Sequence, residues 1–177
     1  MADKKLYDNL YKVIKANSGP ILQNETTLTE ILDLQIPRGY CARVRKVIFH
    51  DNVNADQKLL DHFFFRGALI LDPDDEEHYQ LPTFTIDHDI CCDFEHEYTN
   101  ILGAAAGSLG GSVINNQKTE HIFLEDLDVV TVRNVRFNVQ GIGLKVDGSV
   151  PPQCKCEVYF TYEKISIELY ALLLGIS

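Results

Sequence analysis

The chain has 177 residues and a mass of 20.1 kDa, a length that suits one well-cored domain and is short for two. Apolar residues make up 45% and charged residues 24%, proportions that argue against a disordered chain. The net charge of −10 argues against nucleic acid as the primary partner, because phosphate binding needs a basic surface. No apolar run reaches the roughly 20 residues of a membrane span, and the start lacks a signal peptide's apolar core. We therefore expect a soluble protein made in the cytoplasm.

The N-terminal residues have the apolar spacing of a short amphipathic helix. The residues at i, i+4, i+7 and i+8 are Leu6, Leu10, Val13 and Ile14. The lysines fall mostly elsewhere on the helical wheel, and Ser18-Gly19-Pro20 provides a stop. We therefore expect residues 1–20 to form an N-terminal amphipathic helix or arm and residues 21–177 to form a single domain. The arm could dock on an acidic surface of the same chain or of another copy.

From Thr26 onward, apolar and polar residues alternate with the period of a β-strand. The segments with this pattern, rich in Val, Ile, Phe, Tyr and Thr, are residues 27–36, 40–50, 61–71, 84–98, 119–124, 128–139 and 154–164. Turn signals such as Pro37-Arg38-Gly39 and His50-Asp51-Asn52 separate them. Seven or eight strands without long helical periodicity between them predict an antiparallel sandwich or barrel.

The stretch FTIDHDICCDFEHEY, residues 84–98, concentrates histidines, cysteines and carboxylates as a metal site or an acid/base pair would. Taken every second residue, however, it has one apolar face and one acidic face, and its two adjacent cysteines point opposite ways. His88 and His96 would lie roughly 26 Å apart on an unbroken strand at ~3.3 Å per residue. The alternation therefore favours a structural strand over a metal or catalytic site.

The five cysteines are Cys41, Cys91, Cys92, Cys154 and Cys156. An odd number without secretory context argues against a disulfide framework. The spacing of Cys154 and Cys156 is not that of a zinc knuckle, and no second Cys/His pair follows at a suitable distance. We expect both thiols to be small core residues on a strand.

Further sequence features give no positive sign of catalysis or of a cofactor. The loop GAAAGSLGGS, residues 103–112, lacks the Gly-Lys-Ser/Thr ending of a phosphate-binding loop. No Ser or Cys lies in a nucleophile elbow, the HxH pair of cupin-type metal sites is missing, and Trp is absent. The acidic run Asp72–Glu77, DPDDEE, lacks the spacing of an EF-hand loop. We therefore expect no enzyme activity, no catalytic, metal or cofactor-binding residues and no cofactor.

The C-terminus, SIELYALLLGIS, predicts a short helix after the last strand. Ser166 can cap it and Gly175 can end it. Its apolar stripe would contain Ile167, Tyr170, Leu173 and Leu174. So apolar a segment is either buried under the sandwich or pressed against a neighbouring molecule.

Three segments together resemble the single jelly-roll capsid proteins of icosahedral viruses, especially small acidic ones of tailless double-stranded DNA viruses of archaea and bacteria. They are IPRGYCARVRKVIFHDN, LEDLDVVTVRNVRFNVQGIG and CKCEVYFTYEKISIELYALLLG. The resemblance implies an all-β, eight-stranded antiparallel jelly-roll sandwich with a short N-terminal helix and a short C-terminal helical turn. The N-terminus departs from the long basic arm of small RNA-virus capsid proteins, which argues against direct genome packaging.

As a function, the resemblance implies a virion shell subunit that assembles with copies of itself or with a paralogous capsid protein. Contact with an internal membrane or with other virion proteins fits the same reading, and direct nucleic acid binding does not. The alternative is a β-sandwich module that binds Ca²⁺, a glycan or a receptor. A metal-dependent cupin-like enzyme is a third and weaker hypothesis.

Overall fold

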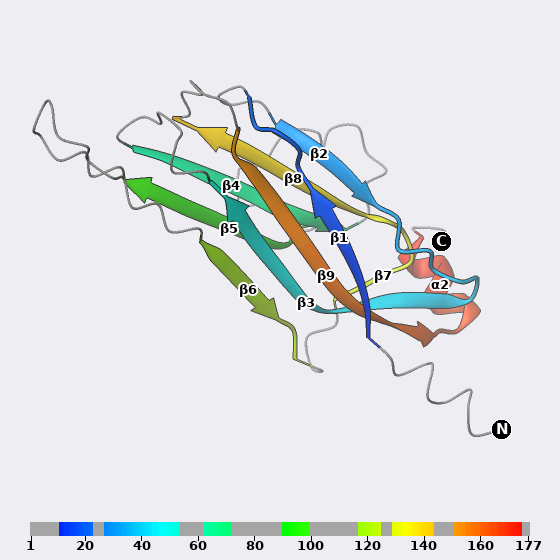
Figure 1. Ribbon diagram of the computed structural model, residues 1–177. Coiled ribbons are helices and arrows are strands. Elements are labelled where there is room, and N and C mark those ends of the chain that lie inside the picture. Colours follow the sequence, from blue (N-terminus) through cyan, green and yellow to red (C-terminus); the bar gives the residue numbers. More distant parts are fainter. Residues whose placement is uncertain are drawn as a thin grey trace, which may run out of the picture.

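The computed structural model describes residues 11–22, 27–53, 62–71, 90–99, 117–124, 129–143 and 151–174. These ranges contain nine strands and one helix (Figure 1). The elements are β1 (Lys12–Asn17), β2 (Thr27–Leu32), β3 (Tyr40–Asn52), β4 (His62–Leu71), β5 (Ile90–Thr99), β6 (Lys118–Ile122), β7 (Val130–Thr131), β8 (Val135–Ile142), β9 (Gln153–Lys164) and α2 (Ile167–Leu173).

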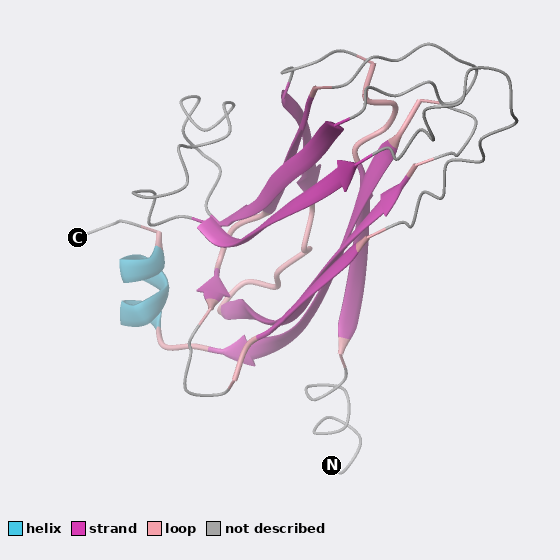
Figure 2. Cartoon of the chain, turned by 90° about the vertical axis from the view of Figure 1, so that its left-hand side faces the viewer, coloured by secondary structure: helices cyan, strands magenta, loops and turns pink. Residues whose placement is uncertain are grey.

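The strands form two sheets in which each strand pairs antiparallel with its neighbours. Sheet A has the order β1-β9-β3-β6, and the two-residue strand β7 also pairs with β3. Sheet B has the order β2-β8-β4-β5. Figure 2 shows the two sheets as separate layers, and one cluster of buried side chains from both fills the space between them. The prediction of an all-β chain is confirmed, with nine strands among the described residues rather than eight.

The predicted N-terminal helix is wrong over residues 12–17, which form the edge strand β1 of sheet A. In this strand Ile14 and Ala16 turn toward the core while Lys15 is exposed, so the side chains alternate with period two. The backbone of β1 pairs with β9, and Lys15 Nζ lies 2.7 Å from Glu157 Oε1 on that strand. Backbone pairing with a sheet edge outweighs the helical spacing of a few apolar residues. Residues 1–10 lie outside the described ranges.

The segment 128–139, predicted as one strand, divides between the two sheets. β7 pairs with β3 in sheet A, and β8 pairs with β2 and β4 in sheet B. The break follows Thr131, whose hydroxyl accepts a hydrogen bond from the Arg133 backbone N–H at 3.0 Å. Asn134 Oδ1 accepts another from the Leu34 N–H at 3.1 Å. These two side-chain bonds, one local and one from the connection between β2 and β3, replace the ladder bonds of a continuous strand and let the chain change sheets.

Aromatic rings form the centre of the core. Phe49 of β3 stacks on Phe94 of β5 with ring centroids 4.6 Å apart, and Phe137 of β8 lies 5.9 Å from Phe49. Phe49 and Phe137 are fully buried. Beside them, a Cβ atom added to Gly67 would lie 2.6 Å from the Asn138 carbonyl oxygen and from the Phe94 ring. The absence of a side chain on Gly67 therefore lets Phe94 pack directly on the backbone of β4.

Candidate functional site

Strand β5 has the alternation that its sequence predicts. Cys92, Phe94, His96 and Tyr98 are buried, and the three carboxylates between them, Asp93, Glu95 and Glu97, are exposed. The interpretation of residues 90–98 as a structural strand with an acidic outer face is therefore confirmed. Residues 84–89, with His88, lie outside the described residues. The loop 103–112 and the acidic run 72–77 lie outside them as well.

His96 belongs to a buried polar cluster that joins the two sheets. Its Nδ1 lies 2.7 Å from Asp51 Oδ2 of β3, and its Nε2 lies 2.6 Å from Thr119 Oγ1 of β6. Tyr98 donates its hydroxyl hydrogen to the same Asp51 oxygen at 2.8 Å. The thiol of Cys154 donates to Asp51 Oδ1 at 3.2 Å. One carboxyl group thus binds residues of β5 in sheet B and of β9 in sheet A.

The Tyr98 hydroxyl is the donor in its hydrogen bond with Asp51. Burial and the adjacent Asp51 raise the pKa of the Tyr98 hydroxyl, so Tyr98 stays a donor.

The order Thr119–His96–Asp51 is also that of a hydroxyl nucleophile, a base and an orienting carboxyl group. His96 is only 3% exposed, however, and Asp51 is buried beside it. Neither the base nor its carboxyl partner is therefore open to a substrate. The role that this geometry supports is to hold β3, β6 and β9 to β5.

Sequence reasoning missed Asp51 because it placed His50-Asp51-Asn52 in a turn, whereas these residues end strand β3. A signal was available in the alternation. Val47, Phe49, Asp51 and Val53 follow one another at every second position, and all four are buried. A carboxylate in phase with core residues indicates a buried polar group that needs partners. The partners themselves come from long-range strand pairing.

The cysteines lie where the sequence predicts small core residues. Cys154 and Cys156 are fully buried, and all five thiols are free. Burial raises the pKa of the Cys154 and Cys156 thiols, which suppresses the reactive thiolate form. Cys91 is the one cysteine that is partly exposed.

We expect Ellman's reagent at pH 8 to modify at most one thiol per native chain, that of Cys91. All five should react once the chain is unfolded in urea, which serves as the control. The measurement is the absorbance of the released thiolate together with peptide mapping of the labelled cysteine. Rapid labelling of Cys154 or Cys156 in the native protein would contradict the packing described here.

Among the described residues, no group of three His, Cys, Asp or Glu side chains is arranged to hold a metal ion. In the same part of the chain, no helix is long and apolar enough to cross a membrane. The surface that stands out is instead apolar and has two parts, one on helix α2 and one around a pocket on sheet A.

The first part is the C-terminal helix α2. As predicted, Ser166 caps it: the Ser166 hydroxyl oxygen accepts the Leu169 backbone N–H at 3.1 Å. None of its residues is buried, and Ile167 and Leu172 are 85% and 72% exposed. Figure 2 shows α2 standing beside the strands rather than between the sheets. Of the two expected alternatives, burial under its own sandwich does not occur.

Helix α2 is nevertheless fixed to the body of the domain. Arg133, in the connection between β7 and β8, donates from Nη2 to the Leu174 carbonyl oxygen at 3.0 Å. A cation at the C-terminal carbonyls of a helix is favoured by the helix dipole. At the other end, only two residues separate α2 from β9, and the Ile165 backbone N–H donates to the Gly39 carbonyl oxygen at 3.2 Å. The fold therefore holds an apolar helix in an exposed position.

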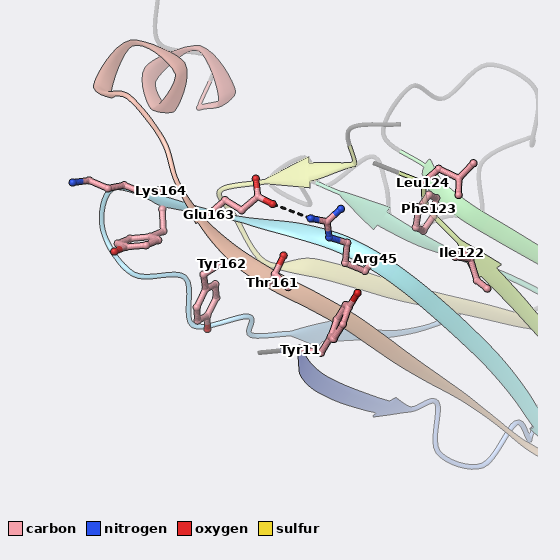
Figure 3. Close-up of a pocket in the computed structure, with 10 residues that line it drawn as sticks. Tyr11, Arg45, Ile122, Phe123, Leu124, Thr161, Tyr162, Glu163 and Lys164 are labelled. Carbon is pink, nitrogen blue, oxygen red and sulfur yellow. Dashed lines mark hydrogen bonds and ion pairs between the residues drawn. The ribbon is translucent and has the colours of Figure 1, made fainter. Parts of the chain in front are cut away.

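The second part is a pocket of about 620 Å³ on the outer face of sheet A (Figure 3). Its rim includes three strongly exposed apolar side chains, Tyr11, Ile122 and Leu124. Glu163 of β9 forms ion pairs with two arginines of β3. Arg43 Nη2 lies 2.7 Å from Glu163 Oε2, and Nη2 of Arg45, which lines the pocket, lies 3.1 Å from Glu163 Oε1.

Two further cations lie at this pocket. Lys164 is exposed on its lining, and Lys12 Nζ lies 5.0 Å from the ring centroid of Tyr162, another lining residue. Arg43 and Arg45 pair with Glu163, and Lys12 and Lys164 add two more positive charges near the pocket. In a chain with a net charge of −10, this is a local concentration of positive charge.

Comparison with known proteins adds no relative: no family model matches the chain, and no curated protein matches its sequence. The exposed helix, the pocket and the strand order are therefore the features of this chain that bear on function.

Proposed function

We propose that the chain folds as a jelly roll. β6 and β7 both pair with β3, so they can be counted as one strand position, which gives eight positions along the chain. The antiparallel pairs are then first with eighth, second with seventh, third with sixth and fourth with fifth, namely β1/β9, β2/β8, β3/β6 and β4/β5. This is a double-stranded ribbon, and the remaining pairs β3/β9 and β4/β8 roll it into two sheets. That arrangement is the jelly roll shared by viral capsid proteins, lectins and cupins.

Within that group, we propose that the chain is the shell subunit of a virion, a structural protein without an active site. The observation that carries this proposal is α2, an apolar helix held outside the sandwich by Arg133. Exposed apolar residues gathered on one element mark an interaction surface. The pocket on sheet A adds a second such surface. A subunit with two separate contact surfaces can bind two neighbours, as a subunit of a larger assembly must.

The partners in this proposal are copies of the same chain or a paralogous capsid protein, with contacts to an internal membrane or to other virion proteins. Direct binding of nucleic acid is not part of it, because the net charge of −10 opposes binding to phosphates. The acidic outer side chains of β5, Asp93, Glu95 and Glu97, would face solvent or a basic partner.

Negative-stain electron microscopy of the purified protein tests the proposal. We expect rings, ordered arrays or closed particles, alone or after addition of the other capsid components. Featureless single molecules under every condition would contradict it. If those molecules gained thermal stability from Ca²⁺ and lost it in chelator, the cation-binding sandwich would replace the shell subunit as the proposed function.

A further inference from the structure

We propose that α2 of one copy docks into the sheet A pocket of a neighbouring copy. This inference rests on the proposed shell function, and the head-to-tail contact would link the subunits in series. The two surfaces lie on the same chain but do not meet within it. No residue of α2 lines the pocket, and Figure 3 shows the helix beyond the end of β9, away from the pocket. Each chain therefore offers one free helix and one free pocket.

The apolar parts of the two surfaces match. Ile167, Leu169 and Leu172 are 85%, 43% and 72% exposed on the helix, and Ile122 and Leu124 are 64% and 67% exposed at the pocket. Burial of these side chains against one another would remove apolar area from water on both partners, which is the main driving force of association. The pocket volume of about 620 Å³ lies within the usual range of ligand-binding pockets in proteins.

The charges match as well. Glu168 is the only charged residue of α2 and is fully exposed to solvent in its first turn. The pocket carries Arg45, Lys164 and Glu163 on its lining, with Arg43 and Lys12 beside it, so its positive charges outnumber its one lining carboxylate. An acidic apolar helix is therefore complementary to this basic apolar pocket, and electrostatic attraction of this kind orients partners as they meet.

The pocket also contains a polar group that lacks a partner. Thr161 is 7% exposed and lines the pocket, and its Oγ1 makes no hydrogen bond among the described residues. A buried hydroxyl without a partner costs free energy, so an acceptor brought in by a docked segment would be favoured here. The Glu168 carboxylate, or a helix carbonyl oxygen, could accept the Thr161 hydroxyl hydrogen.

Docking of α2 into the pocket of another copy gives the assembly a direction. A contact between two different surfaces is heterologous, so repeated addition closes into a ring when the rotation between subunits allows it. A helix that docked against another α2 would instead make an isologous pair, which stops at two copies. The pocket on sheet A therefore favours rings over helix-to-helix dimers.

Cysteine cross-linking tests the contact directly. In a Cys91→Ser background, one chain carries Leu172→Cys on the helix and a second chain carries Ile122→Cys at the pocket. We expect oxidation of the mixture to give a disulfide-linked dimer that neither variant gives alone. Leu172→Cys mixed with Ile31→Cys is the matched control, since Ile31 is 56% exposed on β2 of sheet B. Dimer yields that do not exceed this control would overturn the inference.

Self-association gives a second readout. Leu172→Asp should weaken it about tenfold or more, because an apolar contact residue is replaced by a charge. Ile31→Asp, also at an exposed position, should leave it unchanged. Equal effects of the two variants would contradict docking through α2, and circular dichroism checks that both variants fold.

The two proposals fail in different ways. If the wild-type chain forms shells but the helix-to-pocket cross-link is absent, the docking inference is wrong and the shell function stands. If the cross-link forms but assembly stops at a dimer in which each chain docks its α2 into the pocket of the other, the docking inference stands and the shell function is wrong. A wild-type monomer at every concentration rejects both.

Discussion

Asp51→Ala is expected to destabilise the protein by about 3–5 kcal/mol, because it removes a buried carboxyl group that three buried side chains contact. The side chain of Asp51 is fully buried and receives hydrogen bonds from Tyr98 and the Cys154 thiol besides its contact with His96 Nδ1. The substitution leaves these groups buried without their acceptor, and water cannot replace it without opening the sandwich.

Urea unfolding at one fixed protein concentration measures this effect. At a slope of about 1–3 kcal/mol per molar, the loss should lower the midpoint by roughly 2 M. Asp93→Ala is the matched control, because Asp93 is an exposed carboxylate on the same strand as His96, and its effect should stay within about 0.5 kcal/mol. A loss below about 1 kcal/mol for Asp51→Ala would mean that the cluster does not hold the sheets together.

Phe49→Ala should cost a similar amount, about 3–5 kcal/mol, for a different physical reason. Phe49 of sheet A packs against Phe94 and Phe137, both of sheet B, so its removal leaves a cavity where the two sheets meet. The expected result is a lower urea midpoint with an unchanged slope, since the cavity alters stability and not the surface exposed on unfolding.

Tyr159→Ala is the control for Phe49→Ala. Tyr159 is an aromatic residue on the opposite face of sheet A, where it is only partly buried and its hydroxyl donates to Glu157 Oε2 at 3.0 Å. Its replacement should cost less than about 1 kcal/mol. If both substitutions had the same effect, the aromatic stack would not be the centre of the core.

Alternation of residue types was enough to locate most of the strands. It placed Cys92, Phe94 and His96 on the inner face of β5, and it placed Cys154 and Cys156 in the core. The C-terminal helix was also predictable, because a Ser at the N-cap position before an apolar run is a local signal that needs no tertiary contact. Both features are determined within a few residues of sequence.

Features that depend on distant pairing were not predictable. β1 is a strand because the edge of β9 lies beside it, some 140 positions further along the chain. The break after Thr131 is held in part by the Leu34 N–H, which donates to Asn134 from 100 positions away. The Asp51 cluster likewise needs β3, β5, β6 and β9 in one register. A single sequence does not specify such registers, so neither the inter-sheet cluster nor the sheet A pocket could be derived from it.

The residues that stabilise the domain are different from those exposed for contacts with other molecules. The polar cluster around Asp51 and the phenylalanine stack lie between the sheets and hold them together. The exposed residues of α2 and of the sheet A pocket add little to the stability of one chain. Substitutions at Asp51 or Phe49 should therefore reduce stability, whereas Leu172→Asp should reduce association and leave the unfolding midpoint of the isolated chain unchanged.

Native mass spectrometry of the wild-type protein over a range of concentrations tests the central claim, that this chain is a self-assembling shell subunit. The proposal predicts species of three or more subunits, with masses that are multiples of 20.1 kDa and a share that grows with concentration. A single species at 20.1 kDa across the whole range would contradict it.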